Sequence, residues 1–154
     1  MTDILTGKTF SIGFYKGNSG STETELTNYL IEPALLSGDG DRIEITVKGD
    51  FAKNNNNKHV KLKFGATSVL DSGSIASNGG KWEISVTITR TGESSQTAAA
   101  AFFVNGVQQS SADSSPSETL ASDIPVKLYG KGSVTKDVVG KSLEIKYFKS
   151  VTTA

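Results

Sequence analysis

The sequence predicts an all-β protein, and the strongest observation is the alternation of apolar and polar side chains. Apolar residues recur at every second position in 42–48, 59–65 and 81–90, where they interleave with charged or hydroxyl residues. A period of two places successive side chains on opposite faces of a strand, so each segment predicts a strand with one buried and one solvated face. The composition agrees, because 16 glycines and 3 prolines beside many Ser, Thr and Asn residues are typical of turns between short strands.

The first part of the chain predicts strands with weaker patterns. Residues 8–15 place three aromatic or aliphatic side chains on one face, which indicates a first strand. The apolar segment 26–36 predicts an edge strand or an extended segment, because Pro33 cannot donate a hydrogen bond to a sheet. Further strands are expected at 67–70, 97–104, 124–130 and 141–149. Several short strands at regular spacing favour a sandwich or a barrel, with almost no helix.

The segments 97–104 and 108–119 have less clear patterns, and their structures are argued from composition and from the turn between them. The run 97–104 contains four alanines, which favour a helix, but it is short and ends at a hairpin-turn signal, Asn105-Gly106. We therefore predict a strand there, buried on both faces. The segment 108–119 is rich in Gln and Ser and is predicted to be a polar loop.

Bulk properties limit the class of protein. A length of 154 residues corresponds to about one domain, and the lack of cysteine excludes disulfides and thiolate metal sites. Sixteen basic and sixteen acidic residues cancel, so we expect no nucleic-acid or membrane partner. No apolar run approaches the about 20 residues of a membrane span, and the start of the sequence lacks the pattern of a signal peptide.

Catalytic patterns are weak in this sequence. His59 is the only histidine, and its place after an asparagine run at the start of a strand favours a structural or surface role. No Gly-x-Ser-x-Gly motif is present, and the spacing of the carboxylates does not indicate an acid–base pair. We therefore expect no enzymatic activity and no cofactor.

Asp39 and Asp41 are weak candidates for calcium ligands. They belong to a Gly-Asp-Gly-Asp turn, but the twelfth residue from Asp39 is Asp50 instead of the bidentate glutamate of an EF-hand. The favoured interpretation is a turn in which the aspartates cap backbone amides, so no metal site is predicted.

Residues outside these patterns are candidates for interactions. Trp82 shares the inward row of its strand and is expected in the core. The asparagine run favours a strand connection, with a ladder between subunits or a glycan contact as alternatives. The interaction candidates are Asn54, Asn55, Asn56 and Asn57 in this run, and Tyr29 and Pro33 in the first part of the chain.

The order of features in 37–96 points to a known type of module. Gly38-Asp39-Gly40-Asp41 precedes a strand, Gly49-Asp50-Phe51-Ala52 precedes the asparagine run, and Lys61-Leu62-Lys63-Phe64-Gly65, Asn78-Gly79-Gly80-x-Trp82 and Arg90-Thr91-Gly92 follow. This order resembles a β-sandwich module of tailed-bacteriophage virion structural proteins, of the head-decoration or tail-fibre type. The resemblance implies a jelly-roll-like, trimeric structural protein of a phage particle, and it implies no catalytic residues.

The predicted organisation is one domain, with an N-terminal extended arm and first strands in 1–36 and the antiparallel β-sandwich module in 37–154. The arm and first strands are expected to dock onto a neighbouring subunit or onto the particle. The favoured function is a capsid decoration (cement) protein, made in the bacterial cytoplasm of the host and carried on the virion. Its expected partners are copies of itself, the major capsid or tail proteins, and a host surface glycan. The alternatives are a tail-fibre or tail-tip receptor-binding subunit and a free carbohydrate-binding module, which would need exposed aromatic residues in a groove.

Overall fold

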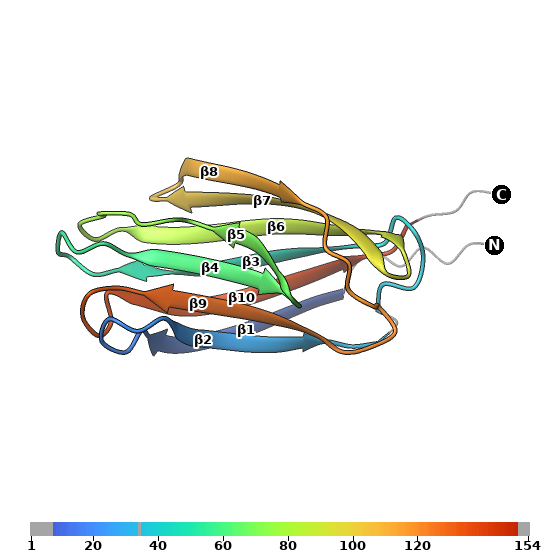
Figure 1. Ribbon diagram of the computed structural model, residues 1–154, viewed down its shortest axis with the longest axis horizontal. Helices are drawn as coiled ribbons and strands as arrows, with labels where there is room; N and C mark the ends of the chain where they lie inside the picture. Colours follow the sequence, from blue (N-terminus) through green and yellow to red (C-terminus); the bar gives the residue numbers. More distant parts are fainter. Residues whose placement is uncertain (1–7, 34, 151–154) are drawn as a thin grey trace.

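Two antiparallel sheets stack face to face in the computed structural model, which describes residues 8–33 and 35–150 (Figure 1). The ten strands are β1 (Lys8–Gly17), β2 (Thr24–Ile31), β3 (Arg42–Phe51), β4 (His59–Phe64), β5 (Thr67–Asp71), β6 (Lys81–Gly92), β7 (Ser95–Val104), β8 (Val107–Ser114), β9 (Ile124–Lys131) and β10 (Val138–Phe148). The described residues form no helix, which confirms the predicted all-β class. Accordingly, this part of the chain has no helix of the length and apolarity needed to cross a membrane.

The strand order is that of a jelly roll. One sheet has the order β1-β10-β3-β6-β7-β8 and the other has the order β2-β9-β4-β5. The pairs β1 with β10, β2 with β9, β3 with β6 and β4 with β5 are nested in the sequence and alternate between the sheets, which is the pattern of two Greek keys wound together. The β7–β8 hairpin is inserted between β6 and β9 and widens the first sheet. The predicted jelly-roll-like sandwich is therefore confirmed by the pairing within this chain.

The core lies between the sheets and is formed by the predicted alternating rows. Its fully buried members include Ile43, Ile45 and Val47 of β3, Ile84, Val86 and Ile88 of β6, Val60, Leu62 and Phe64 of β4, and Val126 and Leu128 of β9. Trp82 is 1% exposed, as expected for a residue in the inward row of β6. Burial of side chains of this size stabilises the fold by about 1.5–3 kcal/mol each.

The first strands belong to the sandwich of their own chain. β1 pairs with the last strand, and β2 pairs with β9, so the segment before residue 37 supplies an edge strand to each sheet. The predicted edge strand in 26–36 lies at Thr24–Ile31 and ends before Pro33, which is exposed in the following turn. The part of the expected arm within residues 1–7 lies outside the described residues.

Two predictions for the β7–β8 hairpin are wrong. β7 is buried on one face only, because Ala98, Ala100 and Phe102 face the other sheet while Ala99 is exposed on the outer face. The predicted polar loop 108–119 contains β8, an edge strand that pairs with β7 through its backbone and needs no buried apolar row. The turn predicted at 105–106 does connect the two strands, with φ of 52° and 79°.

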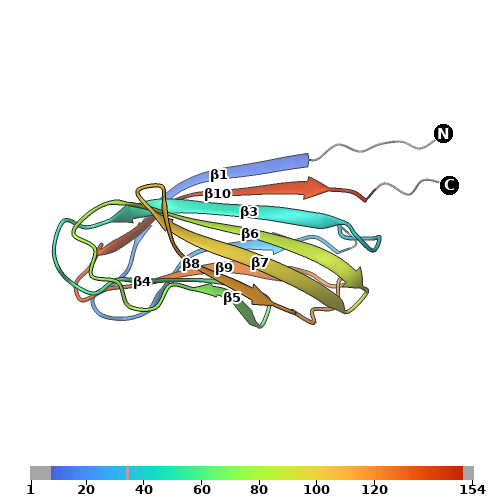
Figure 2. The same cartoon turned by 90° about the horizontal axis from the view of Figure 1, so that it is seen from above.

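The two ends of the sandwich differ. Figure 2 shows the start of β1 and the end of β10 together at one end, and Lys8 is opposite Tyr147 in the sheet. Five connections lie at the opposite end, which we call the loop end. They are four loops, residues 18–23, 52–58, 72–80 and 132–137, and the two-residue turn 105–106.

Candidate functional site

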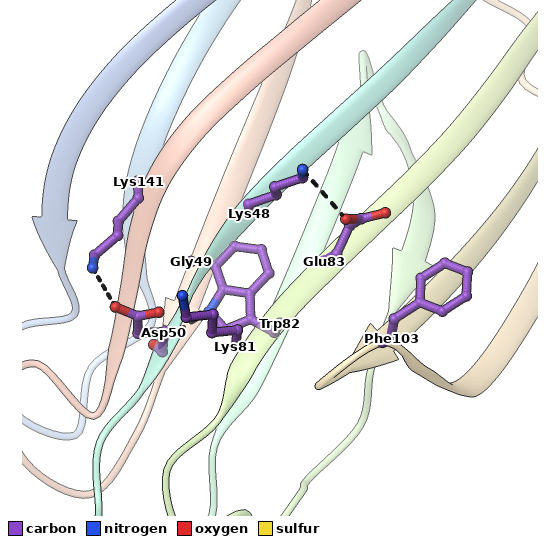
Figure 3. Close-up of a pocket in the computed structure, with 9 residues that line it drawn as sticks. Lys48, Gly49, Asp50, Lys81, Trp82, Glu83, Phe103 and Lys141 are labelled. Atoms are coloured by element: carbon purple, nitrogen blue, oxygen red, sulfur yellow. Dashed lines mark hydrogen bonds and ion pairs between the residues drawn. The ribbon is translucent and has the colours of Figure 1, made fainter.

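One open hollow lies on the outer face of the six-stranded sheet (Figure 3). It has a volume of about 510 Å³, and we call it the outer groove. It crosses β10, β3, β6 and β7 and is lined by Lys48, Gly49, Asp50, Lys81, Trp82, Glu83, Phe103, Gly106 and Lys141.

Ion pairs neutralise most of the charge in the outer groove. Lys48 and Glu83 are directly opposite each other on β3 and β6, with 3.7 Å between Nζ and Oε1. Asp50 accepts a hydrogen bond from Lys141 and raises the pKa of that lysine. Lys81 has no ion-pair partner among the described residues, so one positive charge of the groove is uncompensated. Such exposed pairs contribute little to stability, and here they make the groove polar without a strong field.

The floor of the outer groove is formed by Trp82 and Gly49. The indole lies directly beneath Gly49, where a Cβ atom would overlap both the ring and the Val139 carbonyl oxygen. The indole Nε1 donates to the Asp50 carbonyl oxygen at 3.3 Å, and the side chain is buried. Phe103, half-buried on β7, is therefore the one aromatic ring that reaches the groove from its outer side. The groove can offer hydrogen bonds and one apolar surface, and its two carboxylates are occupied by lysines.

A second candidate is the loop end, where a fully buried lysine ties two loops together. The Nζ atom of Lys58 donates to the Ser77 carbonyl oxygen at 2.6 Å, to Asn54 Oδ1 at 2.8 Å, and to the carbonyl oxygens of Asn54 and Asn56 at 2.9 and 3.2 Å. Burial lowers the pKa of Lys58, and the charge of Asp137 opposes this effect. These four oxygen atoms satisfy the three N–H donors of the ammonium group, one of which is shared, so the charge keeps its hydrogen bonds although it is out of water.

Asp137 is the acidic counterpart of Lys58 and is also fully buried. It accepts hydrogen bonds from Asn54 Nδ2 at 2.7 Å, from Asn56 Nδ2 at 3.1 Å, and from the amides of Ser133 and Val134 at 2.9 and 3.1 Å. Burial would raise the pKa of Asp137, but these hydrogen bonds outweigh it and hold the pKa below its ordinary value. Asn54 thus bridges the buried cation and the buried anion.

Asn18 connects the remaining loop to this network. Its side chain donates to the Val134 carbonyl oxygen at 2.9 Å and accepts from the Val138 amide at 2.8 Å. All four loops of the loop end are therefore held by buried side-chain hydrogen bonds, which fixes their relative positions before any contact with a partner.

The asparagine run divides into two kinds of residue. Asn54 and Asn56 point inward and hold Lys58 and Asp137, while Asn55 and Asn57 are exposed. A hollow of about 310 Å³ lies beside Asn57 and is lined by Asn57, Lys58, His59, Ser74, Lys131, Gly132 and Ser133. The strand-connection interpretation thus describes Asn54 and Asn56, and only Asn55 and Asn57 are available to a partner.

The aspartates of the Gly-Asp-Gly-Asp turn point in different directions. Asp41 is fully buried and accepts the amide hydrogens of Ser37, Gly38 and Ser150 at 3.1, 2.9 and 2.8 Å, so it caps the turn. Burial would raise the pKa of Asp41, and these hydrogen bonds together lower it. Asp39 is exposed and accepts from Arg90 Nε at 3.0 Å. Within residues 8–33 and 35–150, no three His, Asp or Glu side chains gather to form a metal site.

The remaining predicted residues lie away from both candidate sites or at their margin. His59 pairs with Asp71 across β4 and β5. Tyr29 is half-buried on β2, with its ring 6.0 Å from that of Phe10 on β1, and Pro33 lies in an exposed turn.

The buried network was not predicted, although a signal for Lys58 was present. Lys58 has the same parity as the buried row Val60, Leu62 and Phe64, so extending the alternation by one step would have placed it inward. Asp137 and Asn18 carry no comparable signal, because they lie in loops far from Lys58 in the sequence.

Comparisons with known proteins give weak similarities in structure only. No protein-family model matches the chain, and no curated protein matches its sequence. Among solved structures, the crystal structure of the infectious bursal disease virus VP2 subviral particle aligns with a TM-score of 0.42 and 9% identity over 96% of this chain, which spans 34% of that chain. Peanut lectin with a nine-residue peptide aligns with a TM-score of 0.39 and 7% identity over 97% of this chain and 100% of that chain. The jelly-roll assignment therefore depends on the strand pairing of this chain itself.

Proposed function

We propose that this protein is a non-enzymatic structural protein of a bacteriophage virion, and specifically a capsid decoration protein. The observation that carries the proposal is the division of the jelly roll into two unlike ends. The start of β1 and the end of β10 lie together at one end, and polar loops joined by hydrogen bonds of buried side chains form the other. We call the end at which β1 starts and β10 finishes the terminal end. A module of this kind can attach to a particle through its terminal end and present the loop end to the medium.

Two further points support the proposal. Jelly rolls recur in viral capsid and lectin domains, and the segment 37–96 resembles a phage virion module. In an open sandwich the edge strands keep unpaired backbone groups, which association with other copies or with the particle can cover. We therefore retain a homotrimer that docks on the particle surface as the proposed assembly.

The test is the position and copy number of the protein in purified particles. A decoration protein is expected in an icosahedral number of copies, measured by quantitative mass spectrometry against the major capsid protein. Antibody–gold labelling is expected on the heads. A handful of copies per virion, or label restricted to the tails, would contradict the proposal.

A tail-tip or tail-fibre receptor-binding subunit is the second candidate, and the exposed Asn55 and Asn57 on the loop end favour it. Polar side chains on prearranged loops can hydrogen-bond a host surface glycan without a large loss of entropy. The double variant Asn55→Ala/Asn57→Ala would then reduce adsorption of the phage to its host, whereas a decoration protein would leave adsorption unchanged.

A free carbohydrate-binding module has less support from the aromatic residues. Trp82 and Tyr147 are buried, and the exposed Tyr15 does not line the outer groove. Tyr29 and Tyr129 are half-buried and do not line the outer groove either, so the half-buried Phe103 is the stacking surface that the groove offers. A glycan array probed with the wild-type protein and with Phe103→Ser would detect such a module through signals that the variant loses.

A further inference from the structure

β8 is one of the four edge strands of the sandwich. β1, β2 and β8 each contain a register shift, and β5 has only five residues, which are common ways to limit edge-to-edge pairing. In β8 the shift lies next to the hairpin turn, between Gln108 and Ser110, so the register with β7 is regular from Ser110 to Ser114, and the strand contains no proline, lysine or arginine. It forms the outermost strand of the six-stranded sheet in Figure 1.

Two hydroxyl groups on β8 lack partners. The Oγ atoms of Ser110 and Ser114 are buried and make no hydrogen bond with any described residue, and no other side-chain polar atom in the described part of the chain is in this situation. Both residues lie on the inner side of β8, at equal distances in sequence from Ala112. A buried hydroxyl without a partner is unfavourable, so this pair indicates an interaction that the single chain does not complete.

We propose that β8 pairs antiparallel with β8 of a second copy of this chain, in a two-fold register centred on Ala112. In such a pair, residues opposite each other share a face of the sheet. The register places Ser110 of each copy opposite Ser114 of the other, where the two hydroxyls hydrogen-bond across the strands. Centring the pair on Ser111 would instead place Ser110 opposite Ala112 and leave its hydroxyl without a partner.

The outer side of β8 fits the same register. Ser111 and Asp113 are exposed on this side, and the pairing places each Ser111 opposite Asp113 of the other copy. The serine hydroxyl can donate to the carboxylate, and no charge lies directly opposite a like charge. The two six-stranded sheets then form one continuous sheet across the two-fold axis.

The β8–β8 contact does not depend on the proposed function, and it is a different contact from the one that would hold the proposed homotrimer together. A single strand pair buries less than the roughly 1,200 Å² of a standard interface, so we expect weak, concentration-dependent association. If a trimer forms elsewhere on the surface, β8 would join trimers to one another. A variant can therefore lose the β8–β8 contact and keep the trimer, or the reverse, so the β8 proposal and the proposed function can be tested separately.

Cysteine cross-linking tests the register directly, because the chain has no native cysteine. Ala112→Cys is expected to give a disulfide-linked dimer under mild oxidation, since opposite Cα atoms lie about 4.5–5.5 Å apart, within the range for disulfides. Ser110→Cys alone is the matched control. Its two copies would be about 14 Å apart along the strands and should not cross-link. A mixture of Ser110→Cys and Ser114→Cys should form the mixed dimer, and equal cross-linking of every variant, or none with Ala112→Cys, would overturn the proposal.

Two charge variants test the contact without altering the core. Ser111→Lys places a lysine opposite Asp113 of the other copy and should preserve or strengthen the association seen by sedimentation velocity. Ser111→Lys/Asp113→Lys places lysines opposite each other twice and should weaken it at least tenfold. Thermal unfolding should change little in either variant, because both positions are exposed. If the two variants associate equally, the β8 pairing is wrong, whereas loss of particle binding with intact β8 pairing would count against the proposed function alone.

Discussion

At the scale of single residues, Gly49 shows how closely the backbone of β3 packs over the indole of Trp82. A Cβ atom at this position would overlap the Val139 carbonyl oxygen and the indole of Trp82, and neither can move without shifting a strand. We expect Gly49→Ala to lower the free energy of unfolding by more than about 2 kcal/mol, measured by urea denaturation. Gly13→Ala is the control, because a Cβ atom there meets nothing within 4 Å, and an equal loss in both variants would contradict this account.

Lys58 carries a second prediction at this scale. Lys58→Met removes the donor for four oxygen atoms and leaves Asp137 without its nearest buried cation. Removing one member of such a buried arrangement costs about 3–5 kcal/mol of unfolding free energy. Lys53→Met, in the same loop but exposed, should cost less than about 0.5 kcal/mol. Similar values for the two variants would show that the network does not hold the loops.

Three aspartates with lowered pKa values predict a loss of stability in acid. The pKa values of the buried Asp41 and Asp137 and of the exposed Asp71 are all held below the ordinary value, so their stabilisation is complete above the unfolded pKa of about 3.9. It is lost as the pH falls through the folded pKa values, because the unfolded chain then binds more protons. Asp137→Asn should therefore give a protein that is less stable at neutral pH and whose unfolding free energy falls less between about pH 5 and pH 2.5. The exposed Asp123→Asn is the control, and a wild-type slope in Asp137→Asn would refute the assignment.

At the scale of strands, substitutions on the two faces of β7 test whether only one face of this strand is buried. Ala100 faces the opposite sheet and is 6% exposed, whereas its neighbour Ala99 is exposed on the outer face. Ala100→Leu should lower the free energy of unfolding by about 1–3 kcal/mol through overpacking. Ala99→Leu should change it by no more than about 0.5 kcal/mol. Equal destabilisation in chemical denaturation would mean that β7 is covered on both sides in solution.

The strands that the sequence predicted well are those with a buried row. β3, β4 and β6 each place apolar residues on the core at every second position, and burial of one face requires that pattern. β8 was missed because an edge strand can be satisfied by one neighbour and a polar sequence, so its hydrogen bonds leave no trace in the hydrophobic pattern. β7 was wrongly predicted to be buried on both faces, because its alanines are small and fit either the buried or the exposed face of a strand.

At the scale of the whole molecule, the nested pairing predicts that the module 37–154 is not independent. Without residues 1–36, β10 loses β1 and β9 loses β2, so each sheet would expose the edge of a strand that is otherwise interior. We expect the truncated chain to show no cooperative thermal transition and to aggregate. A chain that begins at residue 8 keeps every described strand pair and serves as the control. A cooperative transition of 37–154 near that of the control would show that the module folds alone.

The order of strands could not be read from the residues alone. Alternation identifies which residues face inward but not which strand is the neighbour, so the jelly roll was expected only from resemblance. The same reason explains the missed part of the loop end, because Lys58 and Asp137 meet only after the two sheets have closed. Local patterns in the sequence identified Asn54–Asn57 as candidates for a contact. They did not show that Asn54 and Asn56 form hydrogen bonds with buried residues while Asn55 and Asn57 are exposed.

The pairing of the first strand with the last also determines how the molecule responds to mechanical load. β1 and β10 are antiparallel neighbours, and their outer ends lie together at one end of the sandwich. A pulling force applied between those ends acts across the ladder and opens its hydrogen bonds one after another, as in unzipping. A force between the terminal end and the loop end acts along the strands and must break many bonds at once. The fold therefore resists tension along its length far better than separation of its two termini, so an attachment that must survive shear has to anchor both termini to the same support.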